Sequence, residues 1–143
     1  MTFKQLIKLE NKAKEIWVIS PSLHYDVEHK EFSELVSVNL GESTKYKYIV
    51  PATPLVEKNI KLFKKRFNVS EKDIETNFLI LPPSEINSFL MEIAIYDAST
   101  DCIACAAPAA DDSDEVIVFK AETAKRMARE FTALWKKYKR RRP

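Results

Sequence analysis

Three short apolar runs, each closed by a proline, constrain the fold of this chain more than any other feature. They read EIWVISP, KYKYIVP and FLILPP and occupy residues 15–21, 45–51 and 78–83. Their β-branched and aromatic residues are typical of strands buried on both faces. A proline closes such a run because it has no N–H to donate to the next ladder position. We therefore expect three central strands of one sheet.

Helical patterns separate these runs. Asp26 is expected to cap the first helix, and Gly41, the only glycine of the chain, to follow its last turn at the C′ position. Thr53, followed by a proline at N1, opens the second helix. Ser70 with Asp73 three residues later indicates a short third helix. Strands that alternate with helices predict an α/β fold.

The remaining segments extend the same sheet. Three further strand candidates, at residues 89–97, 102–108 and 115–120, follow one another closely, as hairpins do. A capping box of Thr2 and Gln5 predicts an N-terminal helix, and an apolar stripe from Ala121 predicts a long final one. We expect a mixed sheet of about six strands flanked by helices on both faces. Residues 1–14 would form the N-terminal helix, and residues 15–143 a single domain with a basic C-terminal tail.

The composition narrows the class of protein. The 143 residues carry 23 basic and 21 acidic side chains, a net charge of +2, so the domain as a whole lacks the strong positive field of a nucleic-acid binder. No apolar run approaches the roughly 18 residues of a membrane span, and the N-terminus is too charged for a signal peptide. We expect a cytoplasmic protein without membrane contact. Two cysteines do not make a disulfide framework.

The element order, together with the stretch SFLMEIAIYDASTDCIACAAP at residues 88–108, resembles one half of a phospholipase D superfamily fold. The resemblance covers about residues 15–138. In that family a histidine and a lysine two residues apart precede an aspartate and a Gly-Ser-x-Asn-like turn. Counted back from Asp97, the lysine position holds Glu92 and the histidine position holds Leu90. The four turn positions hold Ala104, Cys105, Ala106 and Ala107.

This degenerate motif implies the fold and argues against the activity. The family's histidine is the nucleophile, and Leu90 has no lone pair to offer. The family's lysine neutralises charge on the phosphate oxygens, whereas a carboxylate at Glu92 would repel them. Glu92 and Asp97 cannot replace the missing groups as an acid and base pair, because residues five apart on a strand point to opposite faces.

Two other groups of residues invite a chemical interpretation. Cys102 and Cys105 form a C-x-x-C, but three residues apart on a strand they diverge, so we expect them to pack in the core and bind no metal. His24, Tyr25 and Asp26 follow the first strand, where open α/β sheets place their binding crevices. With Tyr96 and Asp97 they would form a pocket for a small ligand or partner. In the alternative, Asp26 caps a helix and both histidines lie on a solvated turn.

The sequence thus predicts a catalytically silent, phospholipase D-like binding or regulatory module without a cofactor. We expect a homodimer, because the motif-bearing face, including Leu90, Ile93 and Ile95, is apolar or small. One alternative is a phosphodiesterase or nuclease whose active residues are not yet placed. Another is a nucleic-acid-associated regulator that uses the basic tail. The tail residues are Lys136, Lys137, Lys139, Arg140, Arg141 and Arg142.

Overall fold

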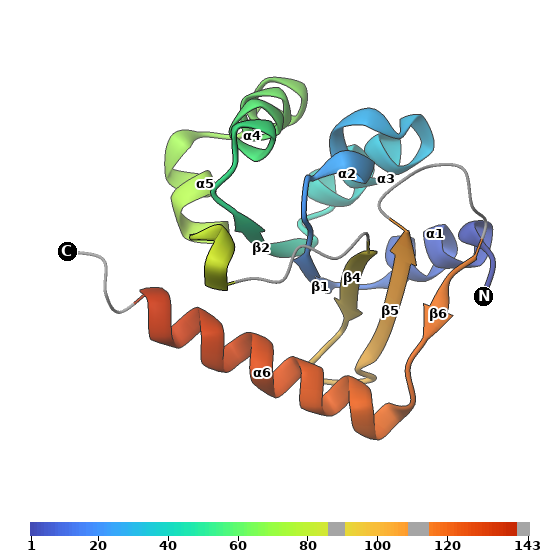
Figure 1. Cartoon of the computed structure of the whole chain (residues 1–143). Coiled ribbons are helices and arrows are strands. Elements are labelled where there is room, and N and C mark those ends of the chain that lie inside the picture. Colours follow the sequence, from blue (N-terminus) through green and yellow to red (C-terminus); the bar gives the residue numbers. More distant parts are fainter. Residues whose placement is uncertain (86–90, 109–114, 140–143) are drawn as a thin grey trace.

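The computed structural model describes residues 1–85, 91–108 and 115–139, and within them six strands form one sheet (Figure 1). The strand order is β3-β2-β1-β4-β5-β6. β1, β2 and β3 are parallel, β4 is antiparallel to β1, and β5 and β6 continue antiparallel. The predicted mixed α/β sheet is confirmed. The strands are β1 (Glu15–Ile19), β2 (Lys45–Pro51), β3 (Phe78–Leu81), β4 (Met91–Tyr96), β5 (Ile103–Pro108) and β6 (Ile117–Val118).

Helices cover both faces of the sheet. One face carries five of the described helices, and α6 (Ala121–Lys139) runs along the other (Figure 1). Phe131 of α6 stacks on Trp17 of β1 at 4.9 Å between ring centroids, so the predicted apolar stripe of the last helix faces the sheet. The helices of the first face are α1 (Phe3–Lys12), α2 (His24–Glu28), α3 (Lys30–Gly41), α4 (Pro54–Phe67) and α5 (Glu71–Asn77). A 3-10 turn, η1 (Pro83–Glu85), follows β3.

Three helix starts were predicted correctly from side-chain chemistry. Thr2 accepts a hydrogen bond from the backbone N–H of Gln5 at the start of α1, and Thr53 caps α4, which has proline in its first turn. Ser70 and Asp73 form the capping box of α5. Each cap satisfies an N–H group that the first helical turn leaves without an intrahelical partner.

Two predictions about the first crossover were wrong. Asp26 does not cap the helix that follows, because the chain forms two helices there. His29 separates them, and its Nδ1 accepts the hydrogen bond from Phe32 N that caps α3. Asp26 instead lies buried inside α2. Gly41 is the last residue of α3 rather than its C′ residue, and the left-handed position falls two residues later on Ser43, with φ 66°.

Successive side chains of β4 and β5 point to opposite faces of the sheet. Glu92, Ala94 and Tyr96 face the layer of α1 to α5, whereas Ile95 packs under α6. Cys105 lies in the first of these cores and Cys102 in the second, so the two buried thiols lie on opposite faces, as predicted. None of the helices in the described part of the chain has the length and apolarity to cross a bilayer.

Candidate functional site: a buried acidic cavity

The candidate site lies at the carboxyl end of β1, where the parallel half of the sheet meets the antiparallel half. Ile19 pairs with Ile93, which places Ser20 beside Glu92 across the two strands. The chain leaves β1 here toward β2 on one side, while β4 occupies the other side. Open α/β sheets bind ligands at such a topological switch point.

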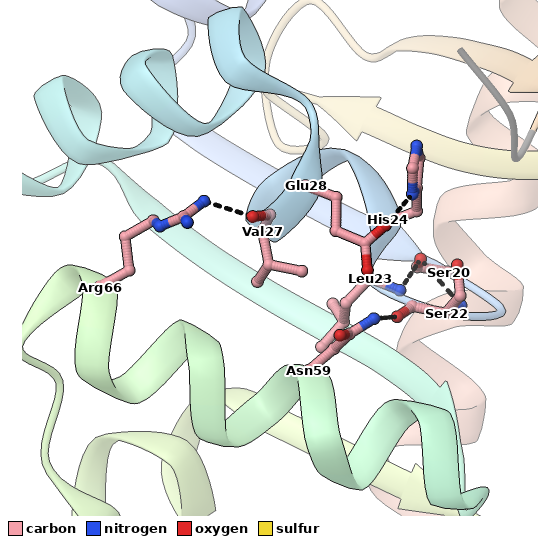
Figure 2. A network of polar contacts seen from close by, with 8 residues as sticks. All are labelled: Ser20, Ser22, Leu23, His24, Val27, Glu28, Asn59 and Arg66. Carbon is pink, nitrogen blue, oxygen red and sulfur yellow. Dashed lines mark hydrogen bonds and ion pairs between the residues drawn. The ribbon is translucent and has the colours of Figure 1, made fainter.

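Hydrogen bonds hold the loop between β1 and α2 (Figure 2). Ser20 Oγ accepts hydrogen bonds from the backbone N–H groups of Ser22 and Leu23, at 3.4 and 2.8 Å. Asn59 of α4 donates through Nδ2 to the carbonyl oxygen of Ser22 at 2.7 Å. Leu23 has a left-handed backbone, with φ 62°, and a fully buried side chain. These contacts fix the start of α2, which then turns Tyr25 and Asp26 into the core.

Side-chain contacts also hold the two ends of α2 (Figure 2). Arg66 of α4 donates to the carbonyl oxygen of Val27 and, at 3.1 Å, to Ser33 Oγ. His24 Nδ1 and Glu28 Oε2 are 3.0 Å apart on the more exposed side of the helix. His24 therefore does not line the cavity described next.

A cavity of about 30 Å³ lies between the helical layer and the β4–β5 hairpin. It exists because the hairpin presents small side chains there. Ala94 pairs with Cys105, and Glu92 pairs with Ala107, so short side chains lie opposite the helices. The helical wall is apolar and aromatic, with Phe3, Leu6, Tyr25 and Phe32.

Glu10 of α1 is buried at one side of this cavity and has a partner for each carboxyl oxygen. Tyr96 donates to Oε1 at 2.8 Å, and Tyr46 donates to Oε2 at 3.0 Å. Asn39 in turn donates to Tyr46 Oη at 3.0 Å. Burial, with a smaller contribution from the charge of Asp26, raises the pKa of Glu10 to about 8, although both tyrosines oppose the rise.

Asp26 and Glu92 are the two other acids of the cavity, and they lack such partners. Asp26 Oδ2 and Glu92 Oε1 have no hydrogen-bond partner. Burial raises the pKa of Asp26 to about 6, and the nearby Tyr48 hydroxyl opposes the rise. Burial first, and then the charge of Asp26, raise the pKa of Glu92 well above its ordinary value, while Ser20 opposes the rise. Both sites thus hold protons more tightly than exposed carboxyls do.

The structure brings together most of the residues singled out in the sequence. Tyr25, Asp26 and Tyr96 line one cavity, as do four of the residues that were aligned with the family motif, Glu92, Cys105, Ala106 and Ala107. Ala104 belongs to the opposite core, under α6. Leu90 lies outside the described residues.

Asp97, from which the resemblance to the family motif was counted, lies at the far end of β4 from Glu92. Its Oδ1 accepts hydrogen bonds from the backbone N–H groups of Lys14 and Glu15, at 2.9 and 3.1 Å. Its backbone is left-handed, with φ 49°, and its carbonyl oxygen accepts from Cys102 N. Asp97 therefore joins the start of β1 to the β4–β5 turn and does not line the cavity.

Glu10, Tyr46 and Tyr48 were missed from the sequence. A signal for Glu10 was present, because it falls on the apolar stripe of α1 one turn after Leu6. A charged residue at such a position is either paired or functional. The KYKY alternation of β2 places both tyrosines on one face.

The basic C-terminal residues divide into different roles. Lys139 Nζ donates to the carbonyl oxygen of Phe78 at 2.9 Å and lies 5.1 Å from the ring centroid of Trp135, so it anchors the end of α6. Lys136 instead lines an open groove beside α6, together with Lys125 and Arg129. Arg140, Arg141 and Arg142 lie outside the described residues.

Among the residues that the structure describes, no group of three or more His, Cys, Asp or Glu side chains is arranged to hold a metal ion. The three acids of the cavity are thus not a metal centre of that kind. The chain matches no family model, no curated protein and no solved structure.

Proposed function

We propose that this chain is a non-catalytic, small-ligand-binding regulatory module, built on a phospholipase D-like half-domain. One observation carries the proposal. The cavity at the switch point of the sheet is lined by two buried carboxyl groups, Asp26 and Glu92, each with an oxygen that has no protein partner. A buried polar atom without a partner costs about 1 to 3 kcal/mol, and a ligand that supplies the partner removes that cost.

The same geometry disfavours phosphodiester cleavage. Glu92 occupies the position where the resemblance expects a lysine, and Asp26 adds a second acid beside it. Asp97 has its carboxylate occupied by two backbone N–H groups at the other end of β4. A phosphodiester would meet negative or neutral groups where its charge needs donors.

A ligand screen by thermal unfolding tests the binding function. Compounds that bind only the folded state raise its stability by RT ln(1 + [L]/Kd), which moves the unfolding temperature by several degrees at about 100 Kd. We expect such compounds to lose their effect on Ala94→Val, which fills the cavity, and to keep it on Val38→Ala, which changes an exposed position of α3. Shifts that are equal in both variants would place the ligand elsewhere. Hydrolysis of bis(p-nitrophenyl) phosphate that Asp97→Asn abolishes would establish the enzyme instead.

The homodimer remains a proposal, but its surface must differ from the one expected. Ile95, Ala104 and Cys105 are already buried within one copy of the chain. We place the contact at the edge strand β6, where Ile117 and Val118 are 52% and 46% exposed, because exposed apolar side chains on an edge strand can pack against a second chain.

Light scattering tests this contact. We expect the dimeric mass to become monomeric in Ile117→Lys and to stay unchanged in Val38→Lys, whose side chain is equally exposed on α3. A wild-type monomer at micromolar concentration would refute the dimer.

A nucleic-acid-associated regulator is the second candidate, favoured by the distribution of charge. The last 23 residues carry nine basic and two acidic side chains, a charge of +7, whereas the first 120 carry 14 and 19, a charge of −5. The groove lined by Lys125, Arg129 and Lys136 includes no acidic side chain among the described residues around it. Such a field binds phosphate backbones through counterion release.

Fluorescence anisotropy with a labelled DNA duplex separates this candidate from the first. Neutralising the three groove cations by alanine should weaken binding and reduce the steepness of its salt dependence. The matched control removes three exposed lysines of α4, Lys58, Lys61 and Lys65. Equal loss in both triple variants would indicate nonspecific attraction only.

A further inference from the structure

The chemistry of the cavity identifies the class of ligand that it accepts. Among its acids, only Glu10 has both oxygens occupied by donors. Asp26 is 3% exposed and Glu92 is 9% exposed; both residues line this space, and each has one carboxyl oxygen without a hydrogen-bond partner. A ligand for this site must therefore donate hydrogen bonds.

The cavity also lacks a cationic side chain that could pair with Asp26 or Glu92 among the described residues that line it. Among the described residues that line the cavity, none is a lysine, arginine or histidine. The α-amino group of Met1 lowers the pKa of Cys105 but is not among the causes of the pKa shifts of Asp26 and Glu92. It donates a hydrogen bond to the carbonyl oxygen of Val116. Buried carboxylates are normally paired with a cation, and without one they hold protons instead. A cationic ligand would replace such a proton.

The walls of the cavity suit an ammonium group that carries a hydrocarbon part. The volume of about 30 Å³ is sufficient for the ammonium head. The rings of Phe3, Tyr25 and Phe32 lie 5.4 to 5.7 Å from one another beside it. Aromatic faces attract ammonium groups and pack well against hydrocarbon.

We propose that this cavity binds the protonated amino group of a small primary alkylamine between Asp26 and Glu92, with the hydrocarbon part against Phe3, Tyr25 and Phe32. This inference rests on the proposed function and specifies its ligand class. The amine's N–H groups would complete the hydrogen bonding of Asp26 Oδ2 and Glu92 Oε1.

Binding of the amine is coupled to proton release. The pKa values of Asp26 and Glu92 are raised mainly by burial, so an arriving ammonium displaces protons from them, and affinity falls as the pH is lowered. The other titratable groups that face the two acids are neutral or mostly neutral near pH 7, since their pKa values are also raised. These groups are Glu10 of α1, Tyr46 and Tyr48 of β2, Tyr96 of β4 and Cys105 of β5.

Isothermal titration calorimetry with propylamine hydrochloride tests the inference. We expect binding to the wild type that weakens by about tenfold or more in Asp26→Asn and in Glu92→Gln, the loss typical of a charge-assisted hydrogen bond. The matched control is Glu28→Gln, which changes a carboxyl of α2 outside the cavity and should leave binding unchanged. In buffers of different ionisation enthalpy, the measured heat should reveal proton release. 1-Propanol, which has the same shape without the charge, should bind far more weakly.

Three results would overturn the inference. These are no binding of propylamine, equal binding of 1-propanol, and equal affinity in all three carboxyl variants. The thermal screen shows whether only the amine inference fails or the proposed binding function fails as well. A neutral or anionic compound whose effect is lost in Ala94→Val would preserve the proposed function and refute the amine. Unfolding curves confirm that each variant folds, and Ala94→Val blocks the cavity while retaining both acids, so a folding defect in one variant leaves the test intact.

Discussion

The buried carboxyl of Glu10 should make the stability of this domain strongly dependent on pH. The pKa of Glu10 in the folded chain is raised mainly by burial to about 8, against an ordinary value of 4.5. Between these two values the folded state binds a proton that the unfolded state has released. The free energy of unfolding therefore falls as the pH rises from about 4.5 to 8, and the stabilisation is fully present only below that window.

The magnitude follows from the gap between the two values. A pKa of about 8 instead of 4.5 corresponds to about 5 kcal/mol lost by pH 9. Since domains of this size are typically stable by only about 5 to 15 kcal/mol, the loss is a large fraction of the total. Glu10→Gln replaces the acid by a neutral side chain of the same shape. We expect the variant to have similar stability at pH 5 and to exceed the wild type by several kcal/mol at pH 9.

Urea unfolding between pH 5 and 9 measures the effect. Asp26 and Glu92 titrate in both the wild type and Glu10→Gln, so their contributions largely cancel in the difference between the two free energies of unfolding. Glu34→Gln, on the exposed side of α3, serves as the control. Because the Tyr96 hydroxyl lowers the pKa of Glu10, Tyr96→Phe should move the loss of stability to higher pH. A difference between wild type and Glu10→Gln that changes by less than about 1 kcal/mol across this range would show that the carboxyl is ionised in the fold at no cost.

Three further predictions concern neighbouring positions. Asp97→Ala should cost about 2 kcal/mol in urea unfolding, because two N–H groups lose their acceptor, whereas Asp97→Asn, which tolerates the left-handed backbone, should cost less than about 1 kcal/mol. Cys102 and Cys105 should resist a thiol reagent until urea is added and should not form an intramolecular disulfide in the native state; burial raises the pKa of Cys105 to about 11. Ala94→Val should stabilise the fold by up to about 1 kcal/mol, measured in urea, while it abolishes ligand binding.

Most of the fold could be predicted from the sequence because the signals were local. Prolines ended the apolar runs, and Thr2, Thr53 and Ser70 marked helix starts through hydrogen bonds within three residues. The prediction for the first crossover was wrong because both Asp26 and His29 precede helical segments and either could act as an N-cap. Asp26 is a good N-cap by type, but burial against the sheet took it into α2, and His29 supplied the cap of α3.

The candidate site was only partly predictable because it depends on register. The position of Tyr25 and Asp26 after the first strand was sufficient to place them at a sheet end. That Glu92 lies beside Ser20 follows from the pairing of β1 with β4, which no local pattern reveals. Glu10 joins them from a helix 82 residues earlier than Glu92 in the chain, so only tertiary packing brings the acids together.

The small and acidic residues of the β4–β5 hairpin have a physical explanation in this geometry. A hairpin selected for packing alone would gain roughly 1 kcal/mol for each additional buried methylene at Ala94 or Ala107. It would also avoid the cost of burying Glu92 opposite the second of these alanines. The chain combines small residues with a buried acid, which leaves both space and an unpartnered oxygen at one place. The unfilled space and the unpartnered oxygen both destabilise the fold when the cavity is empty, and a bound ligand would remove both costs. This combination supports the proposed binding site over a hairpin that serves packing alone.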